Sequence, residues 1–362
     1  MKKLFLILAF FLFPNLVLAK NFDAISVDAI SVGNIDALTI VTPVQYKVFQ
    51  RSGTTGTIYI TGTYNGTPTS IEARFNGGSW ATIVASPSGG AFSGSLTSQA
   101  QGQGLLEVRY TNDTSKSDSV SDVGIGDVFL VAGQSNASGR GSSNQSYSHA
   151  SLKATLFGND YVWKNLTDPF DSASNQVDTV SSDSSPAASG SWVPPLATLI
   201  MANQSVPVAF IPAPLGGTSI TQWQPGANHQ NRSTLYGSMV YRGLQITGGI
   251  KAVLWWQGET DAGTAMSKAT YSSNLSTLVD AIRADLGVPT VLVILQNTSY
   301  ADADEQNIRD AVTELIASDP TDAKLGPDFS DLTTDDGFHF TTTSNLSTVA
   351  SRWWTALQTL FY

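Results

Sequence analysis

From residue 127 onward, short apolar runs alternate with longer segments whose apolar residues recur at helical spacing. Runs short enough to be strands buried on both faces lie at 128–132, 206–211, 252–256 and 290–295. Amphipathic helical spacing is found at 275–286, 308–316 and 346–360. This alternation predicts one doubly wound, mostly parallel, three-layer α/β/α domain over residues 126–362.

In such a domain, ligands bind at the carboxyl ends of the strands, so polar residues that directly follow an apolar run are candidates for a site. The first run is followed by the block G-Q-S-N, which contains Ser135. A serine at a strand-to-helix turn exposes its hydroxyl at the sheet edge, where backbone N–H groups of the turn point at a developing oxyanion. Ser135 is therefore a candidate nucleophile. Ala137 replaces the last glycine of the nucleophile-elbow pattern, and a plain turn is the alternative interpretation.

Two further polar clusters follow apolar runs. The paired glycines Gly216 and Gly217 let the backbone approach a ligand closely, so the Gly217 N–H is a candidate oxyanion donor; a tight connecting turn is the alternative. After the third run, Gln257 is a second candidate donor, through its side-chain amide. Glu259 follows it, and the sequence leaves open whether Glu259 binds substrate, orients another group or caps the next turn.

The chain has three histidines, which limits the choice of a general base. His339 lies three residues after Asp336, and in a short loop this spacing lets the carboxylate contact Nδ1–H while Nε2 faces a serine. Asp335 is a rival for the acid, and a solvated surface loop is the alternative interpretation. His149 and His229 lie in loops rich in Ser and Asn and are expected to be exposed. No compact histidine spacing predicts a metal site.

The residues before 126 divide into three predicted parts. Residues 1–19 combine two lysines, an apolar run and a small-residue end, which predicts a secretory signal peptide cleaved near Ala19. Residues 20–37 carry a tandem five-residue repeat and are expected to form a tether or an added edge strand. Short β-branched and aromatic runs over 38–125 predict a small immunoglobulin-like β-sandwich. Its Trp80 is either a core residue or a sugar-stacking platform.

The composition excludes several classes of function. The net charge is −10, so a nucleic acid partner is not expected. The apolar run at 4–13 is too short to span a bilayer and no later segment comes closer, so no membrane association of the mature form is expected. Cysteine is absent, which excludes disulfides and Cys-ligated metals. The oligomeric state is left open.

The polar blocks resemble, in this order, the SGNH (GDSL-type) hydrolase superfamily, and within it the sialate O-acetylesterases and acetylxylan-esterase-like carbohydrate esterases. The blocks are G-Q-S-N, G-G-T-S-I-x-x-W, W-Q-G-E and D-G-x-H, and the resemblance covers residues 127–362. It implies a flavodoxin-like fold with Ser135 as nucleophile, His339 as base and Asp336 as the acid that orients it. It also implies an oxyanion hole made by the N–H groups of Ser135 and Gly217 and the Gln257 side chain, with no cofactor.

This resemblance implies a secreted or periplasmic serine esterase that removes O-acetyl groups from carbohydrate through an acyl-enzyme. Trp223, and one of the adjacent Trp255 and Trp256, are expected to offer an apolar face to a sugar ring. Arg140 is a candidate partner for a sugar carboxylate, with a structural ion pair as the alternative. The acidic net charge favours a neutral or mildly acidic polysaccharide such as acetylxylan. Hydrolysis of other short-chain esters and non-catalytic glycan binding are the competing interpretations.

Overall fold

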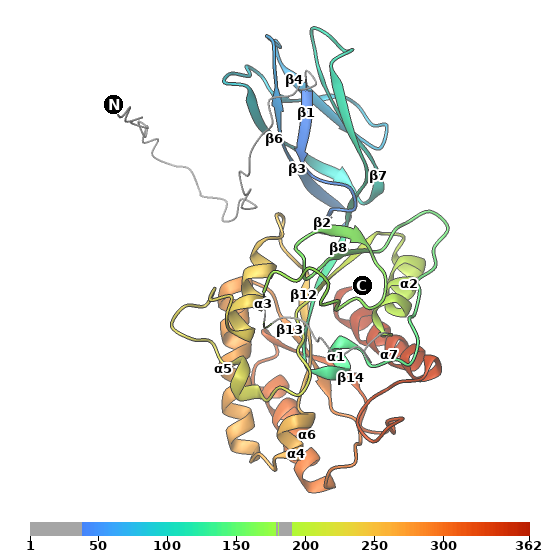
Figure 1. Ribbon diagram of the computed structural model, residues 1–362, viewed down its shortest axis with the longest axis vertical. Coiled ribbons are helices and arrows are strands. Elements are labelled where there is room, and N and C mark those ends of the chain that lie inside the picture. Colours follow the sequence, from blue (N-terminus) through green and yellow to red (C-terminus); the bar gives the residue numbers. More distant parts are fainter. Residues whose placement is uncertain (1–37, 179, 181–189) are drawn as a thin grey trace.

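The computed structural model describes residues 38–178, 180 and 190–362 (Figure 1). The predicted signal peptide at 1–19 and the predicted tether at 20–37 lie outside the described residues. Within these ranges, an all-β region precedes a larger α/β region. No helix in the described ranges is both long and apolar enough to cross a bilayer.

The α/β region is built on a mixed sheet with β8 (Ser117–Gly133) at its centre. The strand order here is β10-β9-β11-β8-β12-β13-β14. These flanking strands are β9 (Thr155–Phe157), β10 (Trp163–Asn165), β11 (Val208–Pro212), β12 (Ala252–Trp256), β13 (Thr290–Ile294) and β14 (Ala323–Asp328). Neighbouring strands pair in parallel, except that β10 is antiparallel to β9. The chain extends the sheet first on the β11 side of β8 and then on the β12 side, so the strand order reverses at β8, where ligands bind in such folds.

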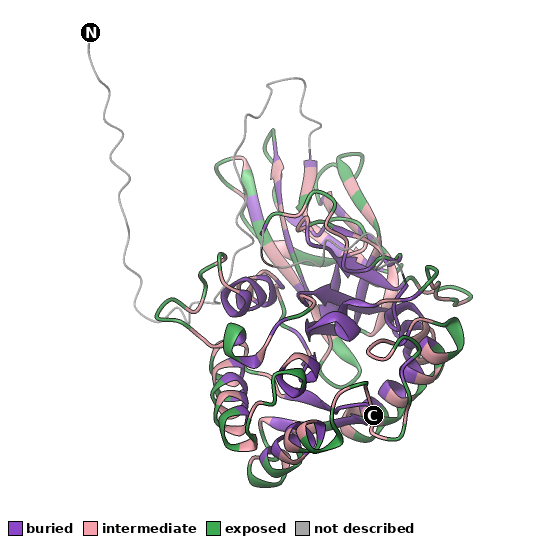
Figure 2. Cartoon of the chain, turned by 60° about the horizontal axis from the view of Figure 1, so that its bottom comes forward, coloured by how far each residue is buried: buried purple, intermediate pink, exposed green. Residues whose placement is uncertain are grey.

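Helices cover both faces of this sheet, and Figure 2 shows the strands between them as buried. The helices on one face are α2 (Val193–Gln204) and α7 (Thr343–Phe361); those on the other are α3 (Leu235–Leu244), α5 (Lys268–Leu286) and α6 (Asp302–Ser318). Phe129 and Val131 of β8 pack toward α2 and α7, whereas Leu130 packs toward the opposite helices. The strand is therefore apolar on both sides. The predicted apolar runs overlap β8, β11, β12 and β13, which confirms the α/β class.

The all-β region has two sheets around a shared apolar core. One sheet consists of β1 (Leu38–Thr42), β3 (Thr55–Tyr64) and β6 (Ala91–Ala100). The other strands are β2 (Val48–Gln50), β4 (Ile71–Phe75), β5 (Ala81–Val84) and β7 (Gly102–Tyr110), and they join the large sheet because β2 and β7 pair with β8. Side chains of both sheets, such as Ile60 and Val108, share the core. One continuous strand thus crosses the boundary predicted at 125–126, while the immunoglobulin-like classification stays a prediction.

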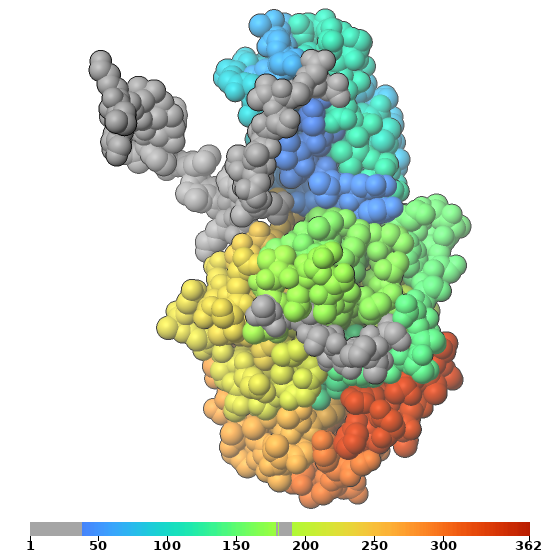
Figure 3. All heavy atoms as spheres, in the orientation of Figure 1, coloured from blue at the N-terminus to red at the C-terminus, as the bar shows by residue number. Residues whose placement is uncertain are grey.

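A buried carboxylate ties the two regions together. Asp127 is fully buried, and it accepts hydrogen bonds from Arg51 Nη2 at 2.9 Å, Lys251 Nζ at 2.7 Å and the Tyr362 hydroxyl at 2.7 Å. Burial alone would raise the pKa of Asp127, but the two cations and the hydroxyl outweigh it and lower the pKa. Arg51 belongs to the all-β region and Lys251 precedes β12, so the cluster fixes the two regions relative to each other. Figure 3 shows their surfaces in contact along this boundary.

Trp80 does not present an open ring. The guanidinium groups of Arg74 and Arg109 lie 4.6 Å and 3.8 Å from its ring centroid. Each arginine is also paired with a glutamate of the neighbouring strand. These contacts disfavour the interpretation of Trp80 as a sugar-stacking platform, because the arginines already cover the ring.

We predict that Asp127→Asn lowers the free energy of unfolding by about 3–5 kcal/mol at neutral pH, because two buried cations lose their counter-charge. Since the pKa of Asp127 is lowered in the native state, this stabilisation is present above the ordinary carboxyl pKa. The difference between wild type and variant should therefore shrink as the pH falls below about 4. Urea titrations of both proteins at neutral pH and below about pH 4 measure this difference in the free energy of unfolding.

The matched control is Lys268→Gln, which breaks an exposed ion pair with Glu314 and should leave stability nearly unchanged. A loss in Asp127→Asn no larger than in this control would contradict the prediction.

Candidate active site

Ser135 lies two residues beyond the last residue of β8, as the first residue of the short helix α1 (Ser135–Ser138). Gly133, two residues earlier, has φ 124°, and a Cβ there would lie 1.9 Å from the carbonyl oxygen of Trp256 at the end of β12. Only glycine permits this close approach of the two strands. This close approach places the residues that follow β8 next to those that follow β12, at the carboxyl ends of the strands.

His339 connects Ser135 to a carboxylate. Its Nε2 lies 3.0 Å from Ser135 Oγ, and its Nδ1 lies 2.9 Å from one oxygen of Asp336. The other Asp336 oxygen accepts hydrogen bonds from the N–H groups of Phe338 and His339. Burial alone would raise the pKa of Asp336, but these hydrogen bonds outweigh it and lower the pKa, so the carboxylate is charged at neutral pH. The three side chains have the order of a nucleophile, a base and an orienting acid.

Asp335 has a different set of partners. Its carboxylate accepts hydrogen bonds from the N–H groups of Thr341 and Thr342 and from Asn345 Nδ2 at the start of α7. Asp335 therefore holds the beginning of that helix, while the carboxylate that faces His339 is the one of Asp336. The sequence spacing does not separate these two acids, whereas their partners do.

Ser135 and His339 line a pocket of about 450 Å³. The other lining residues, from loops and from the start of helix α4 (Glu259–Gly263), are Gln134, Arg140, Gly216, Gly217, Glu259, Thr260, Tyr300 and Phe338. Gly217 is exposed and has φ 72°. Ser135 and Gly217, the two residues expected to offer backbone N–H groups to an oxyanion, thus border the same pocket as His339.

The Gln257 side chain lies behind the wall of this pocket. It is 3% exposed, and its Nε2 donates to the carbonyl oxygen of Thr218 at 3.0 Å and to the carboxylate of Asp261. Its Oε1 accepts a hydrogen bond from the Tyr271 hydroxyl at 3.0 Å. Both amide N–H groups are therefore engaged in the wall. These contacts disfavour the predicted role of Gln257 as an oxyanion donor, because buried acceptors hold its amide beneath the Gly217 loop.

Gln134 offers a side-chain amide at the pocket, a role that the sequence reasoning missed. Its Oε1 accepts hydrogen bonds from the N–H groups of Gly258 at 3.4 Å and Thr260 at 3.3 Å, and from Gln257 Nε2 at 3.4 Å. Donors on several sides of one oxygen fix the orientation of the amide. Nε2 has no acceptor among the described residues and remains available at the pocket. The signal was the position of Gln134 beside Ser135 in the G-Q-S-N block.

The tryptophans near the blocks do not reach the pocket. Trp223, Trp255 and Trp256 are at most 2% exposed. Trp223 packs edge-on against Trp255 with ring centroids 5.1 Å apart, and its Nε1 donates to Thr218 Oγ1 at 3.0 Å. The prediction that Trp223 stacks on a sugar is wrong, because the indole is buried in the core beneath the Gly217 loop. Trp255 and Trp256 do pack on opposite faces of the sheet.

An aromatic wall of the pocket was missed by the sequence reasoning. Tyr300 and Phe338 have ring centroids 5.0 Å apart, and Phe338 directly precedes His339. Tyr300 rests on Gly263, where a Cβ would lie 2.5 Å from the ring. No motif surrounds Tyr300, whereas Phe338 stands inside the D-G-x-H block. Arg140 borders the same pocket, and its Nη1 donates to the carbonyl oxygen of Gly139 at 2.9 Å.

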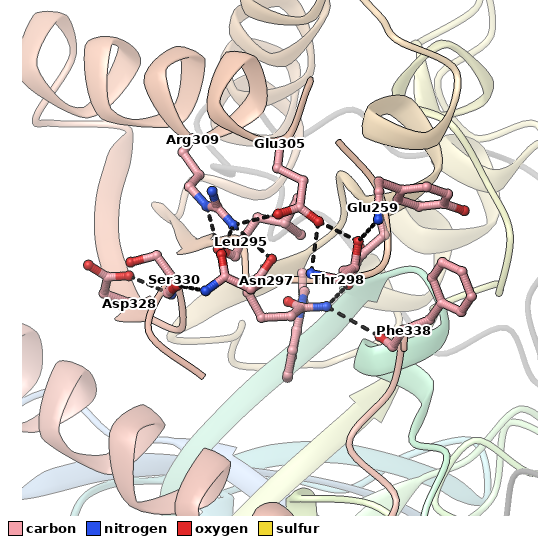
Figure 4. Close-up of polar contacts among 12 residues, drawn as sticks. Glu259, Leu295, Asn297, Thr298, Glu305, Arg309, Asp328, Ser330 and Phe338 are labelled. Atoms are coloured by element: carbon pink, nitrogen blue, oxygen red, sulfur yellow. Dashed lines mark hydrogen bonds and ion pairs between the residues drawn. The ribbon is translucent and has the colours of Figure 1, made fainter. Parts of the chain in front are cut away.

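Glu259 borders the pocket but is only 3% exposed. Its Oε1 accepts hydrogen bonds at 2.8 Å from Asn136 Nδ2 and from Gln296 Nε2. Burial raises the pKa of Glu259. Figure 4 shows Glu259 beside Phe338 and the loop that follows β13. Of the roles left open by the sequence, these contacts favour a residue that orients other groups.

The remaining histidines lie outside this pocket and are half-buried. His149 Nδ1 accepts hydrogen bonds from two backbone N–H groups of its own loop, and His229 pairs with Asp285 at 2.8 Å. Among the described residues, the acidic group with spacing for a metal ion is Asp280, Asp319 and Asp322. It adjoins the amino end of β14, at the opposite edge of the sheet from Ser135.

Residues 125–355 match the family model described as carbohydrate esterase, sialic acid-specific acetylesterase. The chain belongs to this family of carbohydrate esterases. The family description names a class of carboxylic ester hydrolases.

One curated protein and several solved structures are similar to parts of the chain. A probable carbohydrate esterase of Arabidopsis thaliana is 34% identical over 95 residues, which are 25% of this chain and 34% of that protein. The matched segment thus spans about a third of that relative. Among solved structures, a carbohydrate acetylesterase from Xanthomonas citri matches with a TM-score of 0.58 and 20% identity over 89% of this chain and 74% of the other. An Arabidopsis thaliana protein matches with a TM-score of 0.51 and 22% identity over 66% of this chain and 99% of the other. At these identities the two structures show the shared fold.

We predict that Gln134→Glu lowers kcat for a small acetyl ester by about 10²–10³-fold, because it replaces a pocket donor by a charged acceptor. The variant keeps an oxygen for the Gly258 and Thr260 N–H groups, so the fold should be retained. Initial rates with p-nitrophenyl acetate measure the effect.

Gln257→Glu is the matched comparison, since it places a carboxylate against the buried Asp261 and should mainly lower the urea midpoint. The assignment would be overturned if folded Gln134→Glu kept kcat within about threefold while folded Gln257→Glu lost the larger factor.

Proposed function

We propose that this carbohydrate esterase is a serine esterase that removes O-acetyl groups through an acyl-enzyme intermediate. The observation that carries the proposal is the hydrogen-bonded line from Ser135 Oγ through His339 to Asp336, within the fold of a carbohydrate esterase family. A nucleophile, an adjacent base and a group that orients the base are what acyl transfer to a serine requires.

In the first half-reaction, His339 Nε2 takes the proton of Ser135 while Oγ attacks the ester carbonyl. The oxyanion accepts hydrogen bonds from the N–H groups of Ser135 and Gly217 and from the Gln134 amide. Asp336 stabilises the imidazolium, which then protonates the departing sugar oxygen as its bond to the acyl carbon breaks, so the sugar leaves as an alcohol. In the second half-reaction, His339 deprotonates a water that attacks the acetyl-enzyme, and acetate leaves as Ser135 is restored.

The pocket walls support a sugar ester as the substrate. The rings of Tyr300 and Phe338 offer an apolar surface to the C–H face of a pyranose, and Thr260 and Arg140 add polar groups. The net charge of −10 disfavours strongly anionic polymers. We therefore propose a neutral or mildly acidic acetylated polysaccharide such as acetylxylan. O-acetylated sialic acid is the second candidate, because the family description names it and Arg140 suits a carboxylate.

We also propose that the protein is exported, either secreted or periplasmic. The support is the signal-peptide pattern of residues 1–19. An acetylated polysaccharide outside the cell is too large to cross a membrane, so export brings the enzyme to such a substrate.

Acetate release from acetylated xylan and from O-acetylated sialic acid, by wild type and by Ser135→Ala, tests the proposal. We expect wild type to release acetate from at least one of them. The variant should lose at least about 10⁴-fold in kcat, because the acyl-enzyme route needs the nucleophile. The control is Ser347→Ala, which removes an exposed hydroxyl on α7 and should leave the rate unchanged.

Release from p-nitrophenyl acetate alone would favour the competing interpretation of a general short-chain esterase. A folded wild type that releases acetate from no ester would overturn the proposal in favour of glycan binding.

We predict that Tyr300→Ala raises KM for acetylated oligosaccharides about 3–10-fold while kcat for p-nitrophenyl acetate stays unchanged, because the sugar loses a stacking surface. Tyr300→Phe keeps the ring and should retain the wild-type KM. Steady-state kinetics with both substrates distinguish the two effects. Equal KM values in Tyr300→Ala and wild type would show that the sugar binds elsewhere.

A further inference from the structure

Asn136 directly follows Ser135 and takes no part in the steps above, although its side chain is buried and hydrogen-bonded at both ends. Its Nδ2 donates to the carbonyl oxygen of Phe338 at 3.0 Å, and its Oδ1 accepts from the N–H of Phe340 at 3.3 Å. These two residues flank His339. A single carboxamide, one residue from the nucleophile, therefore holds the backbone on both sides of the base.

Glu259 and Gln296 fix the orientation of that carboxamide. Asn136 Nδ2 also donates to Glu259 Oε1 at 2.8 Å, and Gln296 Nε2 donates to the same oxygen at 2.8 Å. Because a carboxylate oxygen only accepts, the Asn136 amide cannot flip without placing its own oxygen against Glu259. Gln296 is fully buried, and its Oε1 accepts from Trp256 Nε1 at 3.1 Å.

The loop that carries Gln296 is itself anchored to α6, as Figure 4 shows. Arg309 Nη2 lies 2.8 Å from Glu305 Oε2 in a buried ion pair, and it donates to the carbonyl oxygen of Gln296 at 3.0 Å. Glu305 Oε1 accepts from the N–H of Thr298 at 2.8 Å. A series of buried contacts thus connects Asn136, through Glu259 and Gln296, to Arg309 on α6.

We propose that Asn136, held by Glu259 and Gln296, is a positioning residue that keeps His339 at hydrogen-bond distance from Ser135. This inference rests on the proposed serine-esterase function and deepens it. Any buried amide adds stability, but this one bonds the two peptide groups next to the base, so turnover depends on it as well. A displacement of about 1 Å between reacting groups lowers rates about 10²-fold.

Asn136→Ala should lower kcat for p-nitrophenyl acetate about 10–10²-fold with KM within about twofold of wild type, because substrate contacts are left in place. The matched control is Asn112→Ala. Asn112 also bridges two backbone groups, accepting from the N–H of Thr69 and donating to the carbonyl oxygen of Thr67, but in the all-β region. The kcat of the Asn112→Ala variant should equal that of wild type.

Asn136→Asp adds a readout that a purely structural role would not move. The charged aspartate lacks a donor for Phe338 and stands against Glu259, whereas the protonated form can still donate. The titratable groups that face residue 136 are Glu259 in α4 (Glu259–Gly263) and His339 in the loop before α7. The kcat of the variant is divided by that of wild type at each pH, so that pH effects common to both enzymes cancel. The ratio should fall at least about tenfold from about pH 5 to about pH 8.

An Asn136→Ala kcat within about twofold of wild type would overturn the proposal, as would a pH-independent ratio for Asn136→Asp. If Asn136→Ala does not fold, the pH series of Asn136→Asp decides alone. A wild type that hydrolyses no acetyl ester would overturn the proposed function instead, so the two failures are distinguishable.

Discussion

The backbone of β8 is the constraint on which the rest of the molecule depends. It pairs with β2 and β7 over its first part and with β11 and β12 over its last, so one strand belongs to both regions. Every residue from Val123 to Gly133 is buried, and a slip of one residue would exchange the two apolar faces. Because Ser135 lies two residues beyond the end of β8, the register of this strand sets where the proposed nucleophile lies. Asp127 and its cations hold the strand where it passes from one region to the other.

The polar groups at the ends of β8, β12 and β13 are buried side by side, which is unfavourable unless they bond one another. Asn136, Glu259 and Gln296 meet this requirement through shared hydrogen bonds, but Glu259 Oε2 has no hydrogen-bond partner among the described residues. Burial raises the pKa of Glu259, while the two amides and the charge of His339 act in the opposite direction. Glu259 is thus electrostatically coupled to His339, and in the proposed mechanism the imidazolium would stabilise the charged form of Glu259.

Periodicity located the strands and helices around the site because apolar spacing reports burial directly. Periodicity did not show that β8 is one continuous strand. Residues 117–122 alternate in exposure, whereas the residues that follow are buried on both faces of the sheet. In the sequence these two patterns look like two separate elements. Motifs also leave side-chain direction open: Gln257 and Trp223 stand in the expected blocks, yet both turn into the wall. No sequence pattern marked Tyr300, because its place in the pocket depends on Gly263, the last residue of α4 in a different part of the chain.

His339 is held by contacts on two sides, and the side chains that make these contacts differ in exposure. The side chain of Asp336 is 48% exposed and that of His339 24%, so water partly screens the charge interaction between them. Asp336 orients the imidazole ring, but it stands on the same loop as His339 and cannot fix that loop relative to Ser135. The fixing contacts must come from outside the loop. In this fold they come from Asn136 and Gln296, which bond the backbone next to the base from the ends of β8 and β13. The hydrogen-bonded line from Ser135 through His339 to Asp336 therefore depends on side chains that take no part in the proposed chemistry, and the sheet edge that carries Ser135 also places His339.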